Sequence, residues 1–190
     1  MNFVDTKIPG VFLVLPKFVN DERGFFTRVF CQKEFRSKKI NFKIKQINNS
    51  LSIKPKTLRG LHYQIAPFGE EKYLRCINGS VLDIVVDLRE GSPTFGEVVV
   101  ERLTSLERNS IFVPKGCAHG FLTLEPNTEV IYLVSEVYSK DHERIIRWND
   151  PIIKEKLTIK PEVISFKDSS SPDYQNSTHA SGYSFQVINL

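Results

Sequence analysis

The chain has 190 residues, a length that fits one domain with its own buried core. Hydrophobic residues make up 41% and charged residues 25%, which excludes an extended disordered chain. The net charge is only +4 and both signs are mixed along the chain, so we expect no nucleic-acid partner, although the mild positive bias suits a small anionic ligand. No apolar run approaches the ~20 residues of a membrane span, and the short N-terminal run is bounded by prolines and preceded by Asp5, unlike a signal peptide.

The cysteine pattern favours a reducing compartment. Cys31, Cys76 and Cys117 are odd in number and widely spaced, which argues against a disulfide framework or a CxxC metal site. Cys76 and Cys117 lie in apolar stretches, as buried thiols do. We therefore expect a cytoplasmic protein.

Taken in chain order, the sequence predicts many short strands rich in β-branched and aromatic residues. Turn signals such as Asn78-Gly79 and Pro114 to Gly116 separate them. One short helix at 32–38 and a further turn at 153–157 complete the pattern, and short strands at regular spacing predict a sandwich or barrel. The predicted strands are 10–15, 25–30, 44–51, 57–64, 72–77, 80–88, 97–103, 110–113, 118–124 and 128–138.

The composition changes near residue 169. Serine, asparagine and proline dominate from there on, which predicts a polar, irregular tail at 169–190 that follows a single domain at 1–168. Within this tail, the stretch 183–190 has the apolar content of a strand that docks on the domain.

Two segments carry candidate chemistry: LRGLHYQ at 58–64 and VPKGCAHGF at 113–121. Each sets one histidine on a predicted strand beside a glycine, and together they resemble the two motifs of cupins, in which histidines and a glutamate bind a metal inside a jelly roll. The departures are informative, because Gln64 replaces a second histidine and Lys72 replaces the glutamate. We therefore predict an all-β, cupin-type jelly roll (a double-sheet β-sandwich) with a few short helices, and no metal or other cofactor.

A lysine in such a cavity suggests a different chemistry. Lys72 would stabilise an oxyanion, the task that a metal would otherwise perform. His62 is a plausible general base, since an imidazole titrates near pH ~6.5. With His119, these side chains fall on three strands that the cupin pairing would bring together, which indicates enolate chemistry next to a carbonyl.

Strand periodicity orients further candidates. Tyr132 and Tyr138 have the same parity in IYLVSEVY, so both are expected to face the cavity, as a proton donor and a stacking surface. Arg59 and His62 have opposite parity, so both reach the cavity only if Gly60 makes a bulge.

At this point the chain resembles the dTDP-4-dehydrorhamnose 3,5-epimerase family, from about residue 10 to 168. The resemblance implies that His62 is the general base, oriented by Asp168, that Tyr132 returns a proton on the opposite ring face, and that Lys72 holds the enolate oxygen. It also implies a sugar pocket lined by His119 and Asp83. The blocks that carry it are DERGFF (21–26), QINNS (46–50), LRGLHYQ (58–64), KYLRC (72–76), VLDIVVDLREGSPTFG (81–96), VPKGCAHGF (113–121), IYLVSEVY (131–138), RWNDP (147–151) and ISFKD (164–168).

The same resemblance implies a nucleotide subsite. Tyr138 and Phe26 are expected to sandwich the base, with the strand of Phe26 crossing from a neighbouring subunit, so a homodimer with shared active sites is expected. Arg28 stands where the family usually has a glutamate near the base, and an arginine at that place would alter base choice. The candidates for binding the diphosphate are Arg23, Arg59, Gln46 and Asn48.

The resulting hypothesis is an isomerase that inverts C3, C5 or both in a nucleotide-diphospho-4-keto-6-deoxy sugar. The expected reaction takes dTDP-4-dehydro-6-deoxyglucose to dTDP-4-dehydrorhamnose without a cofactor. Two alternatives within the fold are an epimerase for GDP- or CDP-linked sugars and a sugar-nucleotide 3,4-ketoisomerase. A non-enzymatic binding module and a metal oxygenase are the alternatives from other classes.

Overall fold

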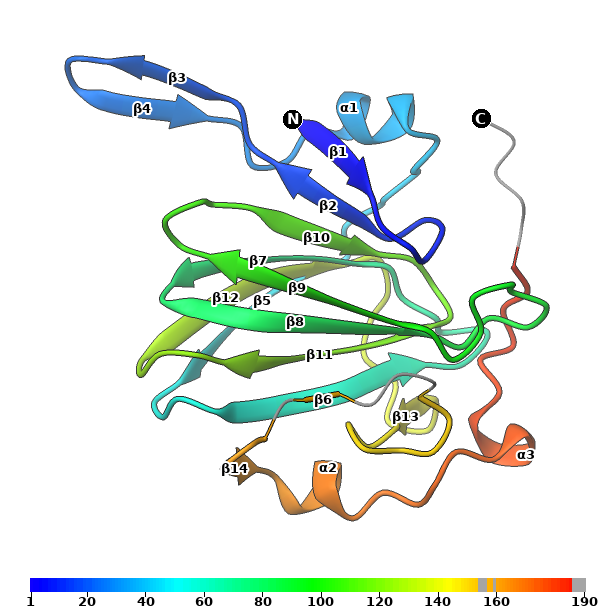
Figure 1. The fold of residues 1–190 in the computed structure, drawn as a ribbon. Helices are drawn as coiled ribbons and strands as arrows, with labels where there is room; N and C mark the ends of the chain where they lie inside the picture. Colours follow the sequence, from blue (N-terminus) through cyan, green and yellow to red (C-terminus); the bar gives the residue numbers. More distant parts are fainter. Residues whose placement is uncertain (154–156, 159, 186–190) are drawn as a thin grey trace.

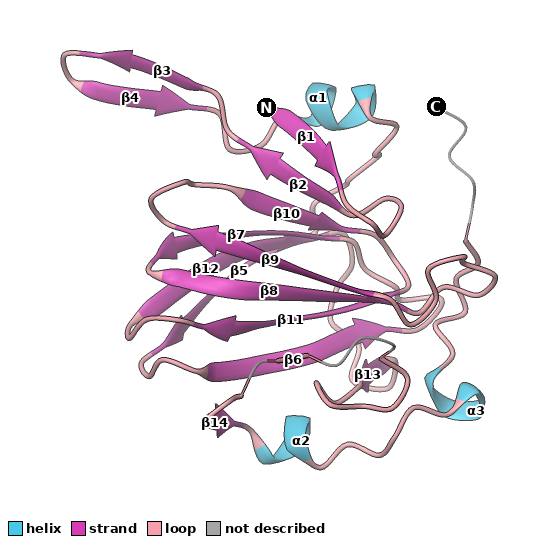
Figure 2. Cartoon of the chain, viewed as in Figure 1, coloured by secondary structure: helices cyan, strands magenta, loops and turns pink. Residues whose placement is uncertain are grey.

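Two sheets packed face to face form the body of the protein (Figures 1 and 2). The computed structural model describes residues 1–153, 157–158 and 160–185. The first sheet has the strand order β1 (Asn2–Asp5), β2 (Phe12–Leu15), β10 (Ser110–Val113), β7 (Lys72–Asn78), β12 (Thr128–Val134) and β5 (Gln46–Ser52). The second has the order β13 (Glu143–Ile145), β6 (Thr57–Gln64), β11 (Cys117–Thr123), β8 (Ser80–Asp87) and β9 (Val98–Thr104), with β14 (Val163–Ile164) parallel to β6. The predicted all-β, double-sheet sandwich is confirmed.

Most predicted strands are present within two residues of their expected ends. The predicted strands at 57–64 and 110–113 match β6 and β10, and the predicted helix matches α1 (Gln32–Ser37). Strands β1, β13, β14 and the helices α2 (Phe166–Ser169) and α3 (Asn176–His179) were not predicted. In the described part of the chain, no helix is long and apolar enough to cross a membrane.

Apolar side chains fill the space between the sheets and also cover the outer face of the second sheet. Val81 and Val85 of β8 belong to the cluster between the sheets, whereas Ile84 and Val86 belong to a second cluster that Trp148 and Ile164 cover from outside. Strand β8 is therefore buried on both faces, which explains its nearly unbroken hydrophobic sequence. Burying these side chains is the main favourable term in the stability of the sandwich.

The first sheet is covered on only part of its outer face. Phe35 of α1 is fully buried and packs edge-on against Phe3, Tyr73 and Phe112, which closes the outer face over β1, β2, β10 and β7. The edge strand β5 keeps apolar side chains exposed on its outer face. These are Ile47 and Leu51, with Ile53 just beyond the strand.

A two-stranded hairpin extends away from the body (Figure 1). Its strands are β3 (Phe18–Asp21) and β4 (Gly24–Thr27), joined by a turn that contains Arg23. All residues of β3 and most of β4 are exposed, so the hairpin presents Val19 and Phe26 to solvent. Strand β3 was not predicted. Strand β4 begins one residue before the start of the predicted strand at 25–30, and it ends three residues before the end of that predicted strand.

The segment after α2 returns to the body of the protein. His179 and Ser181 are buried, and Ser184 forms one parallel bridge with Glu90. Of the stretch 183–190 that was predicted to dock as a strand, residues 186–190 lie outside the described residues, as do 154–156 of the predicted turn at 153–157.

Candidate active site

A cavity of about 500 Å³ opens between the two sheets. One wall comes from the first sheet, through Ser50, Lys72, Leu74 and Tyr132. The opposite wall comes from strands β6 and β11, and the segment around β14 and α2 closes one side. The residues from these elements are Thr57, Leu58, Arg59, His62, His119, Gly120, Phe121, Val163, Ile164, Ser165, Lys167 and Asp168.

His62 and Asp168 form an imidazole–carboxylate pair at this cavity. His62 Nε2 lies 2.7 Å from Asp168 Oδ1, although 106 residues separate the two in sequence. Because an ionised carboxylate only accepts hydrogen bonds, His62 Nε2–H is the donor, which leaves Nδ1 as the basic atom of the ring. The side chain of His62 is 33% exposed, so the imidazole remains accessible from the cavity.

Asp168 is held as a carboxylate. Burial raises its pKa, but the hydrogen bond from His62 and the charge of that imidazole outweigh burial, so the pKa of Asp168 lies below its ordinary value. The Gly60 N–H also donates to Asp168 Oδ2 at 3.3 Å. Locally, Ser165 caps α2 by accepting from the Asp168 N–H at 3.0 Å, which fixes the backbone that carries the carboxylate.

A bulge at Gly60 brings Arg59 and His62 to the same cavity. His62 pairs with His119 across β6 and β11, but the next pair is Arg59 with Phe121, so β6 contains one extra residue there. Gly60 has a φ of +114°, and a Cβ on it would lie 2.7 Å from the Cα of Gly120. The structure therefore meets the condition stated from the sequence, because a bulge at Gly60 lets Arg59 and His62, which have opposite parity, line one wall.

Lys72 brings a cation into the cavity, at the first position of β7. Its side chain is almost fully buried, and Nζ lies 3.3 Å from the carbonyl oxygen of His62. Nζ also forms an ion pair with Glu70 Oε1 at 3.1 Å. Glu70 was not singled out in the sequence, although it lies only two residues from Lys72.

Tyr132 lies on the sheet opposite His62. It is a cross-strand neighbour of Asn48 on β5 and of Leu74 on β7, and its side chain lines the cavity. Its hydroxyl makes no hydrogen bond to any residue that the structure describes. The phenol is therefore free to bond a molecule in the cavity.

His119 and Asp83 form a second imidazole–carboxylate pair. His119 Nε2 lies 3.0 and 2.9 Å from the two carboxylate oxygens of Asp83, and both side chains are buried. The two residues are adjacent as expected, but only His119 lines the cavity, because Asp83 is fully buried. Among the described residues, no group of three or more His, Cys, Asp or Glu side chains could hold a metal ion.

Of the polar side chains predicted to bind the diphosphate from β5 and β6, Arg59 lines the cavity, whereas Gln46 and Asn48 do not. Arg59 donates through Nε to Ser52 Oγ and through a terminal nitrogen to the Leu51 carbonyl, both at 3.1 Å. Gln46 and Asn48 share the face of β5 that carries Ser50. Ser50 lines the cavity itself, and its parity with Gln46 and Asn48 in QINNS was a signal that the sequence interpretation did not use.

Three predicted ligand-binding residues lie outside this cavity, on or next to the β3–β4 hairpin. Arg23 is 85% exposed and pairs with Asp21 at 2.6 Å. Phe26 is 66% exposed, and Arg28 pairs with Glu34 at 3.1 Å. Within one chain, the cavity is therefore formed without them.

Tyr138 also lies outside the cavity, and the expectation that it shares the inward face with Tyr132 is wrong. Strand β12 ends at Val134 rather than at 138, so the alternation that links the two tyrosines stops. Tyr138 is 58% exposed, and its hydroxyl donates to Glu143 at 2.9 Å, in a hollow next to the cavity. Lys167 lines both the cavity and this hollow, and sequence reasoning used only the aspartate of its ISFKD block.

The fold and the site define a cupin-type β-sandwich enzyme whose cavity combines a histidine–aspartate pair, an ammonium group and a phenol. Comparison with known proteins agrees with this class. The family model described as dTDP-4-dehydrorhamnose 3,5-epimerase matches residues 5–176. The chain belongs to that family, whose members are isomerases.

Individual relatives cover most of the chain. The dTDP-4-dehydrorhamnose 3,5-epimerase of Sinorhizobium fredii is 41% identical over 175 residues, which are 90% of this chain and 89% of the relative. The crystal structure of the Bacillus anthracis enzyme of the same name, with TDP and PPi bound, matches with a TM-score of 0.86 and 35% identity over 91% of this chain and 99% of that one. The Legionella pneumophila dTDP-6-deoxy-D-glucose-3,5-epimerase, in complex with dTDP-4-keto-L-rhamnose, matches with a TM-score of 0.82 and 33% identity over 92% and 98% of the two chains.

Proposed function

We propose that this enzyme converts dTDP-4-dehydro-6-deoxyglucose to dTDP-4-dehydrorhamnose by inverting C3 and C5. The observation that carries the proposal is that His62 and Tyr132 line one cavity from opposite sheets. A sugar ring held between them has a base on one face and a phenol on the other. The dTDP-linked sugar bound to the Legionella relative supports the same class of substrate.

The proposed reaction begins with proton abstraction next to the 4-keto group. His62 Nδ1 takes the proton from C3 or C5, and the electron pair of the broken C–H bond moves to the carbonyl oxygen to form an enolate. Asp168 keeps the ring in the required tautomer and stabilises the imidazolium. Tyr132 then gives a proton to the same carbon from the opposite face, so the centre is inverted without net oxidation. Exchange with water restores the protonation of both side chains.

Lys72 is proposed to bind the enolate oxygen. Its ammonium lies in the cavity close to the backbone of His62, so the charge faces the atom on which negative charge develops. A preorganised cation in a site with little water stabilises such an oxyanion much more than the neutral ketone. His119, held by Asp83, is proposed to bind the sugar on the same wall as His62.

The diphosphate is proposed to bind at the mouth of the cavity, along β5 and β6. Arg59 supplies a planar fork of donors that matches phosphate oxygens, and Gln46 and Asn48 supply amide groups nearby. Tyr138 is proposed to stack on the base at the neighbouring hollow, where Lys167 adds a further cation.

A homodimer with shared active sites is proposed for the assembly. Support comes from the projecting hairpin, whose Arg23 and Phe26 are exposed and lie apart from the cavity of their own chain. In a dimer, these residues and Arg28 would complete the nucleotide subsite of the partner. The exposed apolar residues on the outer face of β5, Ile47 and Leu51, suit burial between subunits.

A cytoplasmic location is proposed as well, because Cys31, Cys76 and Cys117 are all unpaired.

The test is proton exchange in heavy water, followed by NMR. We expect deuterium to enter C3 and C5 of the dTDP-linked 4-keto-6-deoxy sugar, with accumulation of the inverted product. The GDP- and CDP-linked sugars, run in parallel, should react more slowly. Faster turnover of either would contradict the nucleotide assignment, a product with its carbonyl at C3 would indicate a ketoisomerase, and no exchange with any of the three would refute the proposal.

A further inference from the structure

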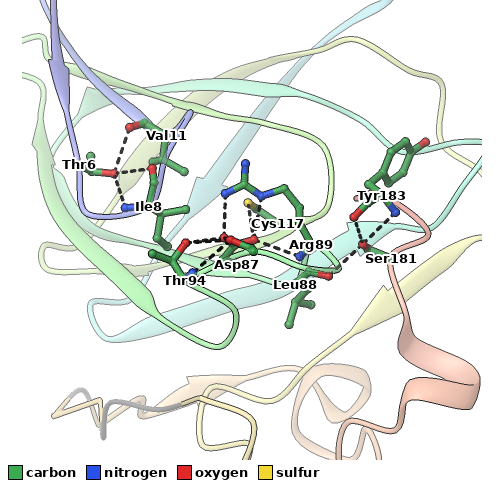
Figure 3. Close-up of polar contacts among 11 residues, drawn as sticks. Thr6, Ile8, Val11, Asp87, Leu88, Arg89, Thr94, Cys117, Ser181 and Tyr183 are labelled. Atoms are coloured by element: carbon green, nitrogen blue, oxygen red, sulfur yellow. Dashed lines mark hydrogen bonds and ion pairs between the residues drawn. The ribbon is translucent and has the colours of Figure 1, made fainter. Parts of the chain in front are cut away.

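The C-terminal residues beyond the family model pack against the 65–70 loop, which precedes Lys72. The family model ends at residue 176, yet the chain continues through α3 and returns to the body at Ser181 and Tyr183. The Ser181 hydroxyl donates to the Leu88 carbonyl at 3.0 Å, and the Ser181 carbonyl accepts from the Ala66 N–H at 3.0 Å. Figure 3 shows Ser181 beside Leu88, with Tyr183 next to it. These bonds anchor the segment between the 65–70 loop and the end of β8.

Tyr183 contacts the loop at one specific point. The Gly69 N–H donates to the Tyr183 hydroxyl at 2.8 Å, and a Cβ on Gly69 would lie 2.1 Å from the aromatic ring. Lys115 Nζ lies over the Tyr183 ring, 5.7 Å from its centroid. The Glu90 N–H donates to the Tyr183 carbonyl at 3.0 Å. The ring is therefore fixed from several sides while its hydroxyl holds the backbone of the loop.

The residue after Gly69 is the one that pairs with the active-site lysine. Glu70 Oε1 lies 3.1 Å from Lys72 Nζ, and both side chains are largely buried. The other contact of Nζ is the His62 carbonyl at 3.3 Å. Two supports thus fix the ammonium, and the position of one of them depends on the backbone that Tyr183 holds.

We infer that Tyr183 is a positioning residue for Lys72, acting through Gly69 and Glu70. The inference rests on the proposed role of Lys72 as the group that binds the enolate oxygen. An oxyanion donor stabilises a transition state only if it is held within a few tenths of an ångström of its place, so a loose 69–70 backbone lowers the rate of enolisation. Substrate binding depends on other residues, and it should change little.

The experiment compares Tyr183→Phe with Tyr174→Phe in the full-length enzyme. Tyr183→Phe removes only the hydroxyl that accepts from Gly69, and we expect kcat for C3 and C5 exchange to fall about 3- to 10-fold while KM changes by less than about twofold. Tyr174 lies just before that segment, and its hydroxyl bonds no described residue, so Tyr174→Phe should leave both constants unchanged. An unchanged kcat in Tyr183→Phe would overturn the inference.

Two further measurements separate positioning from general support of the fold. In a Lys72→Met background, Tyr183→Phe should have no additional effect on the residual rate, whereas an equal fall there would overturn the inference. Backbone amides of residues 66–72 should exchange faster with deuterium in Tyr183→Phe, while those of β8 should not. Failure of the wild-type enzyme to exchange substrate protons would refute the proposed function instead, and amide exchange would still decide whether Tyr183 holds the loop.

Discussion

His62 and His119 face each other directly across β6 and β11, yet their environments differ sharply. Each imidazole donates to a carboxylate, Asp168 in one case and Asp83 in the other. The side chain of His62 is 33% exposed, whereas that of His119 is 5% exposed. His62 therefore combines an oriented ring with greater access to a molecule in the cavity, which supports the proposal that it is the base.

Replacing the two histidines should separate their roles. We expect His62→Asn to lower the rate of C3 and C5 proton exchange by about 10²- to 10⁴-fold, because asparagine cannot accept the proton. His119→Asn should retain measurable exchange and raise KM instead. Steady-state exchange rates measured by NMR in heavy water compare the two variants directly. Equal losses of kcat would contradict the assignment of the base.

Tyr132→Phe should uncouple exchange from inversion. The variant keeps the base and Lys72, so protons should still leave C3 and C5 and return as deuterium on the same face. Without the phenolic proton on the opposite face, formation of the inverted product should fall about 10²-fold or more. The stereochemistry of the deuterated sugar, read by NMR, is the measurement. Normal inversion by Tyr132→Phe would exclude the tyrosine as the proton donor.

Lys72→Met should affect the chemical step more than binding. Methionine keeps most of the volume of the side chain but removes the charge that is proposed to bind the enolate oxygen, so kcat should fall about 10²- to 10³-fold with a small change in KM. The variant must first be shown to be folded by circular dichroism, since Glu70 loses its partner. A loss confined to KM would mean that Lys72 binds substrate without stabilising the enolate.

Mixing two inactive variants tests the shared active site. In the proposed dimer, a heterodimer of His62→Asn and Phe26→Ala chains has one site with both native residues. Subunit exchange between equal amounts of the two should therefore restore about a quarter of wild-type activity, because half of the dimers are mixed and each mixed dimer has one intact site. Each variant alone is the control. If activity does not rise on mixing, the hairpin does not reach the site of its partner.

Asp87→Asn should destabilise the fold in a pH-dependent way. Asp87 is fully buried and accepts from Arg89 and Thr94 (Figure 3), as well as from Ser92. The change should therefore cost about 3–5 kcal/mol by leaving the Arg89 cation without its carboxylate. Burial raises the pKa of Asp87, but the hydrogen bonds from Arg89 and Ser92 outweigh burial, so its pKa lies below the ordinary value.

The lowered pKa sets the direction of the pH effect. A carboxyl with a depressed folded-state pKa stabilises the fold above its unfolded pKa, near pH ~3.9, and loses this effect as the pH falls through the folded value. The difference in unfolding free energy between wild type and Asp87→Asn should therefore be constant near neutral pH and shrink below about pH 4. Urea unfolding across this range measures it, and a difference that grows on acidification would contradict the assignment.

Much of the site could be predicted because its residues lie on regular strands with strong local patterns. His62, His119 and Lys72 each occupy a strand whose period is visible in the sequence, and the opposite parity of Arg59 and His62 showed that both could reach the cavity only through a bulge at Gly60. These features depend on a few consecutive residues, so the sequence alone contains the information.

What could not be predicted depends on contacts between distant segments. Strand β12 ends at Val134, and the next residue, Ser135, bonds Glu71 just before β7: its N–H donates to the Glu71 carbonyl, and its hydroxyl accepts from the Glu71 N–H. Tyr138 lies outside the cavity, where its N–H donates to Gln46 and its hydroxyl donates to Glu143, and no local periodicity reports these contacts. In the same way, Ser181 is buried although the composition around it is polar, because its hydrogen-bond partners come from Leu88 and Ala66.

The contact between Gly60 and Gly120 limits how the substrate range of this enzyme can be changed. A side chain on Gly120 would approach the Arg59 carbonyl to 2.5 Å, so neither glycine tolerates a substitution without moving the wall that carries His62 and Arg59. Enlarging the pocket for a bulkier sugar is therefore practical only from the facing sheet. Ser50 and Leu74 are the positions where a library could vary volume and polarity while the backbone around the base stays intact.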